Sequence, residues 1–236
     1  MAAGFRRALL KISGEALAAD AGRGIDRDKT TWLALEIARA ASAGRQVGIV
    51  IGGGNILRGA NAGSLGVPRL VADEMGMVAT VLNALALKSA LQQAGIAAVA
   101  MCAFPVGRFI EVFDRQKALD YLDKGYVTVF AGGTGNPCFT TDSAAALRAV
   151  EIGAQVMVKG TQVSGVYDKD PRTNPDAQRF ERISPAEVLG RRLGVIDAAC
   201  VDILDRHGIP VIVLNIHETG NLAAALAGED VGTVIG

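Results

Sequence analysis

Short runs of apolar residues, rich in valine and isoleucine, alternate along the chain with longer segments in which apolar residues recur every three or four positions. The short runs predict buried β-strands, and the longer segments predict amphipathic helices. We expect strands at 8–12, 47–51, 96–101, 127–131, 156–159 and 211–215, and helices at 29–43, 70–93, 115–124, 142–152, 197–207 and 221–227. This alternation is typical of a three-layer αβα fold, in which helices cover both faces of a central, mostly parallel sheet.

Nothing in the 236 residues marks a domain boundary, because no repeat, low-complexity tract or linker rich in proline or serine interrupts the pattern. We therefore expect one domain over residues 1–236, in one lobe or two. The most irregular stretch, 168–185, contains three prolines and many charged residues. Such a composition predicts a surface excursion.

Composition and charge narrow the classes of function. The 24 basic and 24 acidic side chains cancel, so the chain has no overall positive field to hold nucleic acid or an anionic membrane. No apolar stretch reaches the roughly 20 residues of a membrane span, and the most apolar helix is interrupted by Thr80 and Asn83. The apolar run after Arg7 is too short for a signal peptide. We expect a cytoplasmic protein that binds neither nucleic acid nor membrane.

Cysteine and histidine do not suggest a metal site or a disulfide framework. Cys102, Cys138 and Cys200 are far apart and odd in number. His207 and His217 are not at metal-ligand spacing from another histidine or cysteine. We expect reduced thiols, no protein metal site, and a helix-ending role for His207, which precedes a glycine.

Three turns that contain glycine follow predicted strands, at 11–14, 52–55 and 132–136. The carboxyl ends of parallel strands meet at one edge of a sheet, where glycine lets backbone N–H groups converge on an anion. One such turn is as well explained by a tight connection, but three at equivalent strand ends indicate a phosphate site. None of them matches the fingerprint of P-loop NTPases or of dinucleotide oxidoreductases, so both classes lose support.

Cations suited to phosphate accompany these turns. Lys11 ends an apolar strand at a glycine turn, and Arg58 follows the second turn by four residues. Lys159 ends the fifth predicted strand, although a solvated surface cation explains it equally well. Several phosphates could be neutralised at once by such a set.

Carboxylates complete the candidate chemistry at Asp73, Asp142, Asp170 and Asp197. Asp142 follows two threonines at a predicted helix start, where an acid also complements the helix N-terminus. Phosphoryl transfer needs cations that stabilise charge on the moving group, and acids that hold those cations or Mg²⁺. Since a phosphate acceptor is already ionised at neutral pH, the reaction needs no catalytic histidine.

Five segments resemble the bacterial uridylate (UMP) kinase family of the amino acid kinase superfamily. They are LLKISGEAL at 9–17, VIGGGNILRG at 50–59, DEMGMVAT at 73–80, GGTGNPCFTTDSAAALRA at 132–149 and GVYDKDP at 165–171. The resemblance covers essentially the whole chain. It implies an amino acid kinase-like fold and transfer of the γ-phosphoryl group of Mg-ATP to UMP, which gives UDP and ADP in pyrimidine nucleotide synthesis.

The resemblance also implies which residues form the site. The ATP-binding residues would be Lys11, Ile12, Ser13, Gly14, Gly54, Arg58, Thr161, Tyr167 and Asp170, and the UMP-binding residues Gly53, Asp73, Thr134, Gly135, Asn136, Pro137, Cys138, Phe139, Thr140 and Thr141. Lys11, Arg58, Asp142 and Asp197 would be catalytic, with Asp142 orienting Lys11. Mg²⁺ would arrive with ATP.

Assembly and regulation follow from the same resemblance, which implies a homohexamer, activation by GTP at loop 19–24 and inhibition by UTP. The apolar helix at 70–93 suits either a subunit contact or burial within the chain. Three residues depart from the family pattern: Cys138 replaces an aromatic residue, Gln155 an acid and Ser164 an aspartate. They bear on the uracil pocket, the support of the site and the adenine loop rather than on the reaction.

Two alternatives remain open at this stage. One is a related phosphotransferase with a different acceptor, and the other is a non-catalytic nucleotide-binding protein on the same fold. Lys11 and Asp142 together argue against the second, because binding alone does not need a lysine held by an acid.

Overall fold

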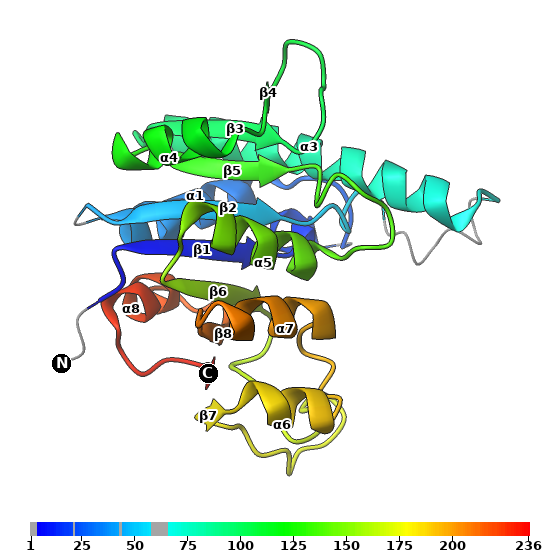
Figure 1. Ribbon diagram of the computed structural model, residues 1–236, viewed down its shortest axis with the longest axis vertical. Helices are drawn as coiled ribbons and strands as arrows, with labels where there is room; N and C mark the ends of the chain where they lie inside the picture. Colours follow the sequence, from blue (N-terminus) through cyan, green and yellow to red (C-terminus); the bar gives the residue numbers. More distant parts are fainter. Residues whose placement is uncertain (1–3, 21, 43, 58–65) are drawn as a thin grey trace.

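The computed structural model describes residues 4–20, 22–42, 44–57 and 66–236, and Figure 1 shows these folded around one sheet. The described strands are β1 (Arg7–Ile12), β2 (Gln46–Ile51), β3 (Ala98–Cys102), β4 (Glu111–Val112), β5 (Val127–Ala131), β6 (Val156–Thr161), β7 (Arg182–Ile183), β8 (Val211–Asn215) and β9 (Thr233–Ile235). Their order across the sheet is β4-β3-β5-β2-β1-β6-β8-β9-β7. Among these strands β8 and β9 pair antiparallel, and the other neighbours are parallel.

Helices cover both faces of the sheet, as the sequence predicts (Figure 1). One face carries α1 (Arg27–Ala41), α3 (Arg69–Gln93) and α8 (Asn221–Ala227); the other carries α4 (Arg115–Asp123), α5 (Thr141–Ile152) and α7 (Ala198–Arg206). The short helices η1 (Gly14–Leu17) and α6 (Pro185–Gly190) follow β1 and β7.

The core has two parts because side chains alternate across each strand. Leu10 and Ile12 of β1 pack with α1 and α3, whereas Leu9 packs with α5. Both faces of the central strands are covered, so their sequences are continuous apolar runs rather than alternating patterns. The parallel pairing of β1 with β2 and β6, and of β2 with β5, places the carboxyl ends of these strands along one edge.

The long elements confirm the predicted pattern. β5, β8 and α8 have the predicted bounds, and the other predicted strands and helices are displaced by only a few residues. The sequence pattern missed β4, β7, β9, η1 and α6, which contain two to six residues. Such segments are too short to show a period. β7 lies in the stretch 168–185 that we expected to be only a surface excursion, and it pairs with β9.

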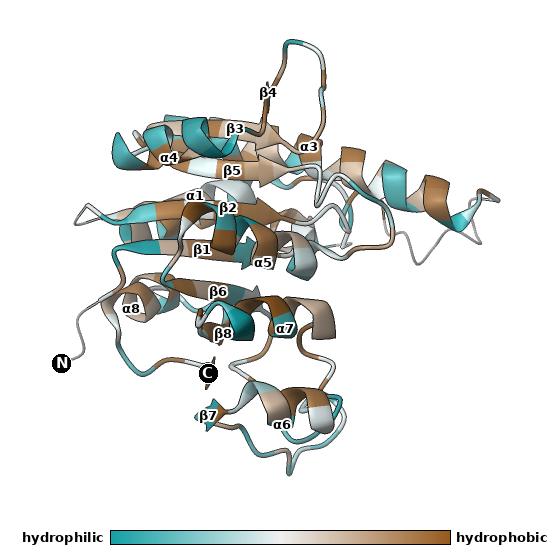
Figure 2. Ribbon diagram, viewed as in Figure 1, coloured by the Kyte–Doolittle hydropathy of each residue, from teal (hydrophilic) through white to brown (hydrophobic). Residues whose placement is uncertain are grey.

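The helix α3 has two unlike sides. Within the described chain it is the one helix long and apolar enough to cross a membrane, by length and composition. Its inner side packs against the sheet and carries the buried polar residues Thr80 and Asn83, so it is a helix of the protein core. The opposite side exposes Val71, Met75, Val78 and Leu82, and Figure 2 shows hydrophobic residues along this helix. Burial on both sides would need a second surface beyond the described residues.

Candidate functional site

The predicted glycine turns lie together at the carboxyl edge of the sheet. In the register of the sheet, Ile12 pairs with Ile51 of β2 and with Gly160 of β6, so the turns after these strands are neighbours. Gly52 marks how closely they approach, because a Cβ built on it would lie 3.2 Å from the backbone nitrogen of Gly14. The structure therefore brings the first two turns into contact.

Three charged side chains meet at this edge. Lys11 and Lys159 are paired neighbours on β1 and β6, and Asp142 reaches both from the first turn of α5. The Lys11 ammonium lies 2.9 Å from Asp142 Oδ1, and the Lys159 ammonium donates to Oδ2. All three side chains are at most 13% exposed. The alternative that Lys159 is a solvated surface cation is therefore wrong.

We call Lys11, Asp142 and Lys159 the charged trio. Burial alone would raise the pKa of Asp142, but attraction to the two lysines outweighs it and holds that pKa below its usual value. Burial lowers the pKa of Lys159, and attraction to Asp142 does not cancel this shift. With the aspartate ionised and both lysines protonated, the trio carries one net positive charge. That unbalanced charge suits an anionic ligand.

Thr140 caps the helix that presents Asp142. Its Oγ1 accepts hydrogen bonds from the backbone nitrogens of Asp142 and Ser143, which fixes the first turn of α5. Asp197 supports this cap, because it accepts hydrogen bonds from the hydroxyls of Thr140 and Ser143 while capping α7 through the backbone nitrogen of Cys200. Asp197 thus holds the helix start and lines neither of the two pockets described below.

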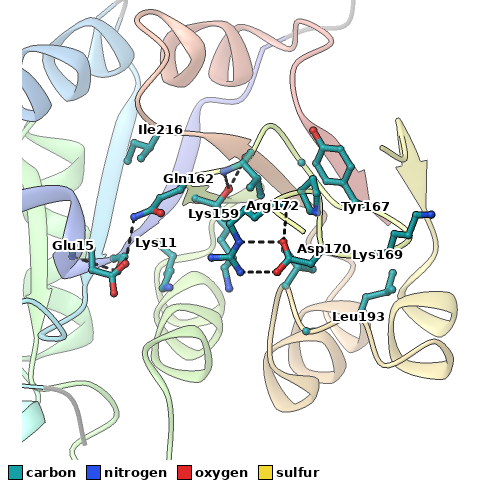
Figure 3. A pocket seen from close by; sticks show the side chains of 18 of the residues that line it. Lys11, Glu15, Lys159, Gln162, Tyr167, Lys169, Asp170, Arg172, Leu193 and Ile216 are labelled. Carbon is teal, nitrogen blue, oxygen red and sulfur yellow. Dashed lines mark hydrogen bonds and ion pairs between the residues drawn. The ribbon is translucent and has the colours of Figure 1, made fainter. Parts of the chain in front are cut away.

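A cavity of about 610 Å³ opens beside β6 (Figure 3) and is called the β6 pocket. Of the expected ATP-binding residues it contains Lys11, Ser13, Thr161, Tyr167 and Asp170, and Lys159 lines it as well. Ile12 is fully buried in β1, and neither Ile12 nor Gly14 lines the cavity. The structure therefore brings together about half of the expected ATP set around the trio.

The rim of the β6 pocket carries cations that we did not single out from the sequence. Arg172 makes a two-pronged ion pair with Asp170, at 3.1 Å and 3.0 Å, and its hydrogen bonds hold the pKa of Asp170 low. Lys169, Arg191 and Arg192 also line this pocket. The charged residues in and after the 165–171 motif were the available signal for these cations. We interpreted them only as part of a surface excursion.

A second cavity, of about 330 Å³, lies against the N-terminal half of α3 and is called the α3 pocket. Of the expected UMP-binding residues it contains Gly53, Asp73, Thr134, Asn136, Pro137, Phe139, Thr140 and Thr141. Gly54, expected among the ATP residues, lines this pocket instead, and Gly135 and Cys138 line neither one. Thr141, next to Asp142, brings the α3 pocket to the charged trio.

Asp73 is held from two sides inside the α3 pocket. Its Oδ1 accepts from Arg69 Nε at 2.9 Å, and its Oδ2 accepts from the backbone nitrogen of Cys138 at 3.1 Å. The hydrogen bond from Arg69 lowers the pKa of Asp73, although burial opposes it. Asp73 is the fifth residue of α3, which begins at Arg69. An ionised acceptor thus faces the cavity.

Three further positions were singled out in the sequence analysis, namely Arg58, Gln155 and Ser164. Arg58 lies outside the described residues. Gln155 is at the opposite end of β6 from the trio, where its side chain accepts from the backbone nitrogens of Arg6 and Arg7. Ser164 donates to Glu218 at 3.2 Å. Of the three departures, Cys138 alone therefore touches a residue of the α3 pocket.

Comparison with known proteins gives one consistent family. Residues 6–215 match the amino acid kinase family. The uridylate kinase of Mesorhizobium japonicum is 49% identical over 231 residues, which are 98% of this chain and 96% of that protein. The crystal structure of UMP kinase from Bacillus anthracis superposes with a TM-score of 0.95 at 33% identity, over 98% of this chain and 96% of the other. That of UMP kinase from Ureaplasma parvum gives 0.91 at 35% identity, over 98% of each chain.

Proposed function

This chain belongs to the amino acid kinase family, and on that premise we propose that it transfers the γ-phosphoryl group of ATP to UMP, forming ADP and UDP. The observation that carries the proposal is the charged trio between two pockets. Lys11 and Lys159 line the β6 pocket, while Thr141, beside Asp142, lines the α3 pocket. The reacting groups of two substrates bound in these pockets would meet at the charged trio, which carries one net positive charge.

Phosphoryl transfer at this site depends on position and electrostatics. Lys11 and Lys159 stabilise the charge that spreads over the transferring group, and Asp142 keeps both ammonium groups in place. The attacking oxygen belongs to the phosphate of UMP and is already ionised, so no side chain has to remove a proton. Asp197, through Thr140, fixes the helix that carries Asp142.

Mg²⁺ is the cofactor that we propose to accompany ATP. The described residues hold no cluster of three His, Cys, Asp or Glu side chains for a metal. Asp142 Oδ1 is a buried carboxylate oxygen that is already paired with the Lys11 ammonium at 2.9 Å, although magnesium prefers carboxylate oxygens. The residues therefore fit an ion held mainly by the phosphates of ATP. When bound, Mg²⁺ would neutralise part of their charge.

We assign ATP to the β6 pocket and UMP to the α3 pocket. The β6 pocket is the larger, and it reaches from the trio to Tyr167 and Asp170. The α3 pocket presents Asp73, whose ionised carboxylate suits the ribose hydroxyls of UMP. Arg58 is proposed to contact the transferring phosphate. All described strands belong to one sheet, which supports a single domain over residues 1–236.

The acceptor is tested by measuring ADP release with UMP, CMP, dUMP and small acids in turn. We expect UMP to give the highest kcat/KM, because the α3 pocket combines phosphate-facing glycine turns with Asp73. A tenfold preference for any other acceptor, equivalent to about 1.4 kcal/mol in transition-state binding, would overturn the assignment. Nucleotide binding without turnover would favour the non-catalytic alternative.

The variant Asp73→Ala adds a second arm to this assay. Charge-assisted hydrogen bonds from ribose hydroxyls to Asp73 are worth about 1.5–3 kcal/mol each, and dUMP lacks one hydroxyl. The variant should raise the KM for UMP and reduce the UMP-to-dUMP ratio. An unchanged ratio, with only a lower melting temperature, would restrict Asp73 to holding Arg69 and the Cys138 backbone.

We also propose that the protein assembles as a homohexamer. The outer side of α3 exposes Val71, Met75, Val78 and Leu82 at the spacing of a helix–helix contact. Covering them would remove apolar surface from water. Light scattering at micromolar concentration should give six times the chain mass, and a monomer mass would contradict the proposal.

Regulation and location complete the proposed function. GTP is proposed as an activator at loop 19–24 and UTP as an inhibitor. Within the described part of that loop, Gly24 exchanges two hydrogen bonds with Asn55 of the turn after β2. A ligand at the loop would therefore act on a turn that borders the α3 pocket. A cytoplasmic location fits an enzyme whose substrates are nucleotides.

A further inference from the structure

One side of α3 is hydrogen-bonded to backbone around the α3 pocket at three points. Asp73, Thr80 and Asn83 project from the same side of the helix, since Thr80 follows Asp73 by nearly two full turns and Asn83 follows Thr80 by about five-sixths of a turn. Asp73 holds the backbone of Cys138, Thr80 holds Gly132, and Asn83 holds Gly52. Gly52 and Gly132 belong to the two glycine turns that border the pocket, and Cys138 follows the second turn by two residues.

Thr80 fixes the turn after β5. Its buried Oγ1 accepts a hydrogen bond from the backbone nitrogen of Gly132 at 2.7 Å and donates to the carbonyl oxygen of Met77 at 2.6 Å. Gly132 has a φ of 80°, and a Cβ on it would lie 2.8 Å from Cys102 Sγ. The turn is thus packed on one side and held by a hydrogen bond on the other. Thr80 lines the α3 pocket, but in this arrangement its only hydroxyl proton is donated to Met77 and not into the cavity.

Asn83 fixes the turn after β2 through Asn55. The two side-chain amides pair reciprocally, at 2.7 Å and 3.1 Å, and both are almost fully buried. The second N–H of Asn83 donates to the carbonyl oxygen of Gly52 at 2.6 Å, and that of Asn55 donates to the carbonyl oxygen of Gly24 at 2.7 Å. Every amide proton in the pair therefore has an acceptor, and the pair joins three segments.

The turn also fits closely against α3. A Cβ on Gly53 would lie 2.8 Å from the carbonyl oxygen of Gly76 and 3.0 Å from the backbone nitrogen of Thr80. A Cβ on Gly14 would overlap the amides of Asn55 and Asn83. Small displacements of the helix must therefore move the turn with it.

We propose that Thr80 and Asn83 are positioning residues for the phosphoryl transfer to UMP. Their hydrogen bonds from the inner side of α3 fix the two glycine turns of the α3 pocket. The inference rests on the proposed function. The neighbouring positions Ala84 and Leu87 show that apolar side chains fill this side of the helix where no turn has to be held. Buried polar groups are costly unless they are hydrogen-bonded, and here their partners are backbone atoms of the site.

The test for Thr80 uses isosteric variants. Thr80→Val removes the hydroxyl and keeps the shape, and it should raise both the KM and the calorimetric Kd for UMP about tenfold, since small misplacements of binding groups cost one to two orders of magnitude. The KM for ATP should change less than about twofold. Thr80→Ser keeps the oxygen and should recover most of the affinity for UMP. Thr30→Val is the matched control, because that buried hydroxyl donates only within α1 and lines neither pocket.

The test for Asn83 uses Asn83→Asp, which keeps the size and removes the donor to Gly52. It should lower kcat about tenfold with an unchanged circular dichroism spectrum. Wild-type UMP affinity in Thr80→Val, or an equal loss in Thr80→Val and Thr80→Ser, would overturn the positioning role. Calorimetry decides this independently of turnover, whereas a wild-type chain that releases no ADP with UMP would overturn the proposed function.

Discussion

Replacing Lys11 with methionine is expected to lower kcat by about 10²- to 10³-fold, because it deletes one preorganised cation at the transferring phosphate. The charge of the trio falls from +1 to zero, since Lys159 and Asp142 then neutralise each other. Methionine has a similar length and suits a buried strand, so the fold should remain. Steady-state ADP release gives kcat, and circular dichroism checks the fold.

Lys124→Met is the control for loss of a lysine. Lys124 is an exposed residue at the end of α4 that lines neither pocket, and its replacement should leave kcat unchanged. Near-normal turnover in Lys11→Met, with an intact circular dichroism spectrum, would show that Lys11 is a structural ion-pair partner only.

Replacing Asp142 with asparagine is expected to lower the free energy of unfolding by about 3–5 kcal/mol, the usual result of breaking a buried pair. The change leaves two neighbouring buried ammonium groups without a counter-charge. In the wild type the folded-state pKa of Asp142 is lowered, so its ionised form stabilises the fold above about pH 4, the unfolded-state pKa. This contribution disappears as the pH falls through the lowered folded-state value, and the gap between variant and wild type should close there. Denaturant unfolding at several pH values measures it.

The double variant Asp142→Asn with Lys159→Met separates charge balance from catalysis. It returns the trio to one net positive charge and removes the repulsion between the lysines, so part of the lost stability should return, although Lys11 still lacks a counter-charge. Turnover should stay low because Lys11 then has no acid to orient it. Equal stability of the wild type and Asp142→Asn at neutral pH would contradict the role of Asp142 as counter-charge.

The long elements of the fold and the edge that holds the site could be predicted from the sequence. Val47 to Ile51 is a continuous apolar run, and Val127 to Ala131 is interrupted only by the buried Thr128, because both faces of these strands are covered. Lys11 was identifiable because it interrupts such a run next to a glycine turn. The apolar pattern therefore predicted which strands are buried. The ends of those strands then indicated the carboxyl edge of the sheet.

The partners across the sheet could not be predicted in the same way. Lys159 lies opposite Lys11 because of the β1–β6 register, which joins residues nearly 150 positions apart. Thr80 and Asn83 were visible only as interruptions of an apolar helix. Their partners, Gly132 and Asn55, lie 52 and 28 residues away and carry no pattern that points back to the helix.

The two sides of α3 have a mechanical consequence. A helix of 25 residues is a stiff rod about 37 Å long. The inner side of α3 is hydrogen-bonded to both glycine turns of the α3 pocket. A surface that packs against the outer side would displace the helix as a unit, and the hydrogen bonds of Asp73, Thr80 and Asn83 would carry that displacement to the pocket. The affinity for UMP would then depend on protein concentration through mass action. Dilution would weaken UMP binding before it unfolds the chain.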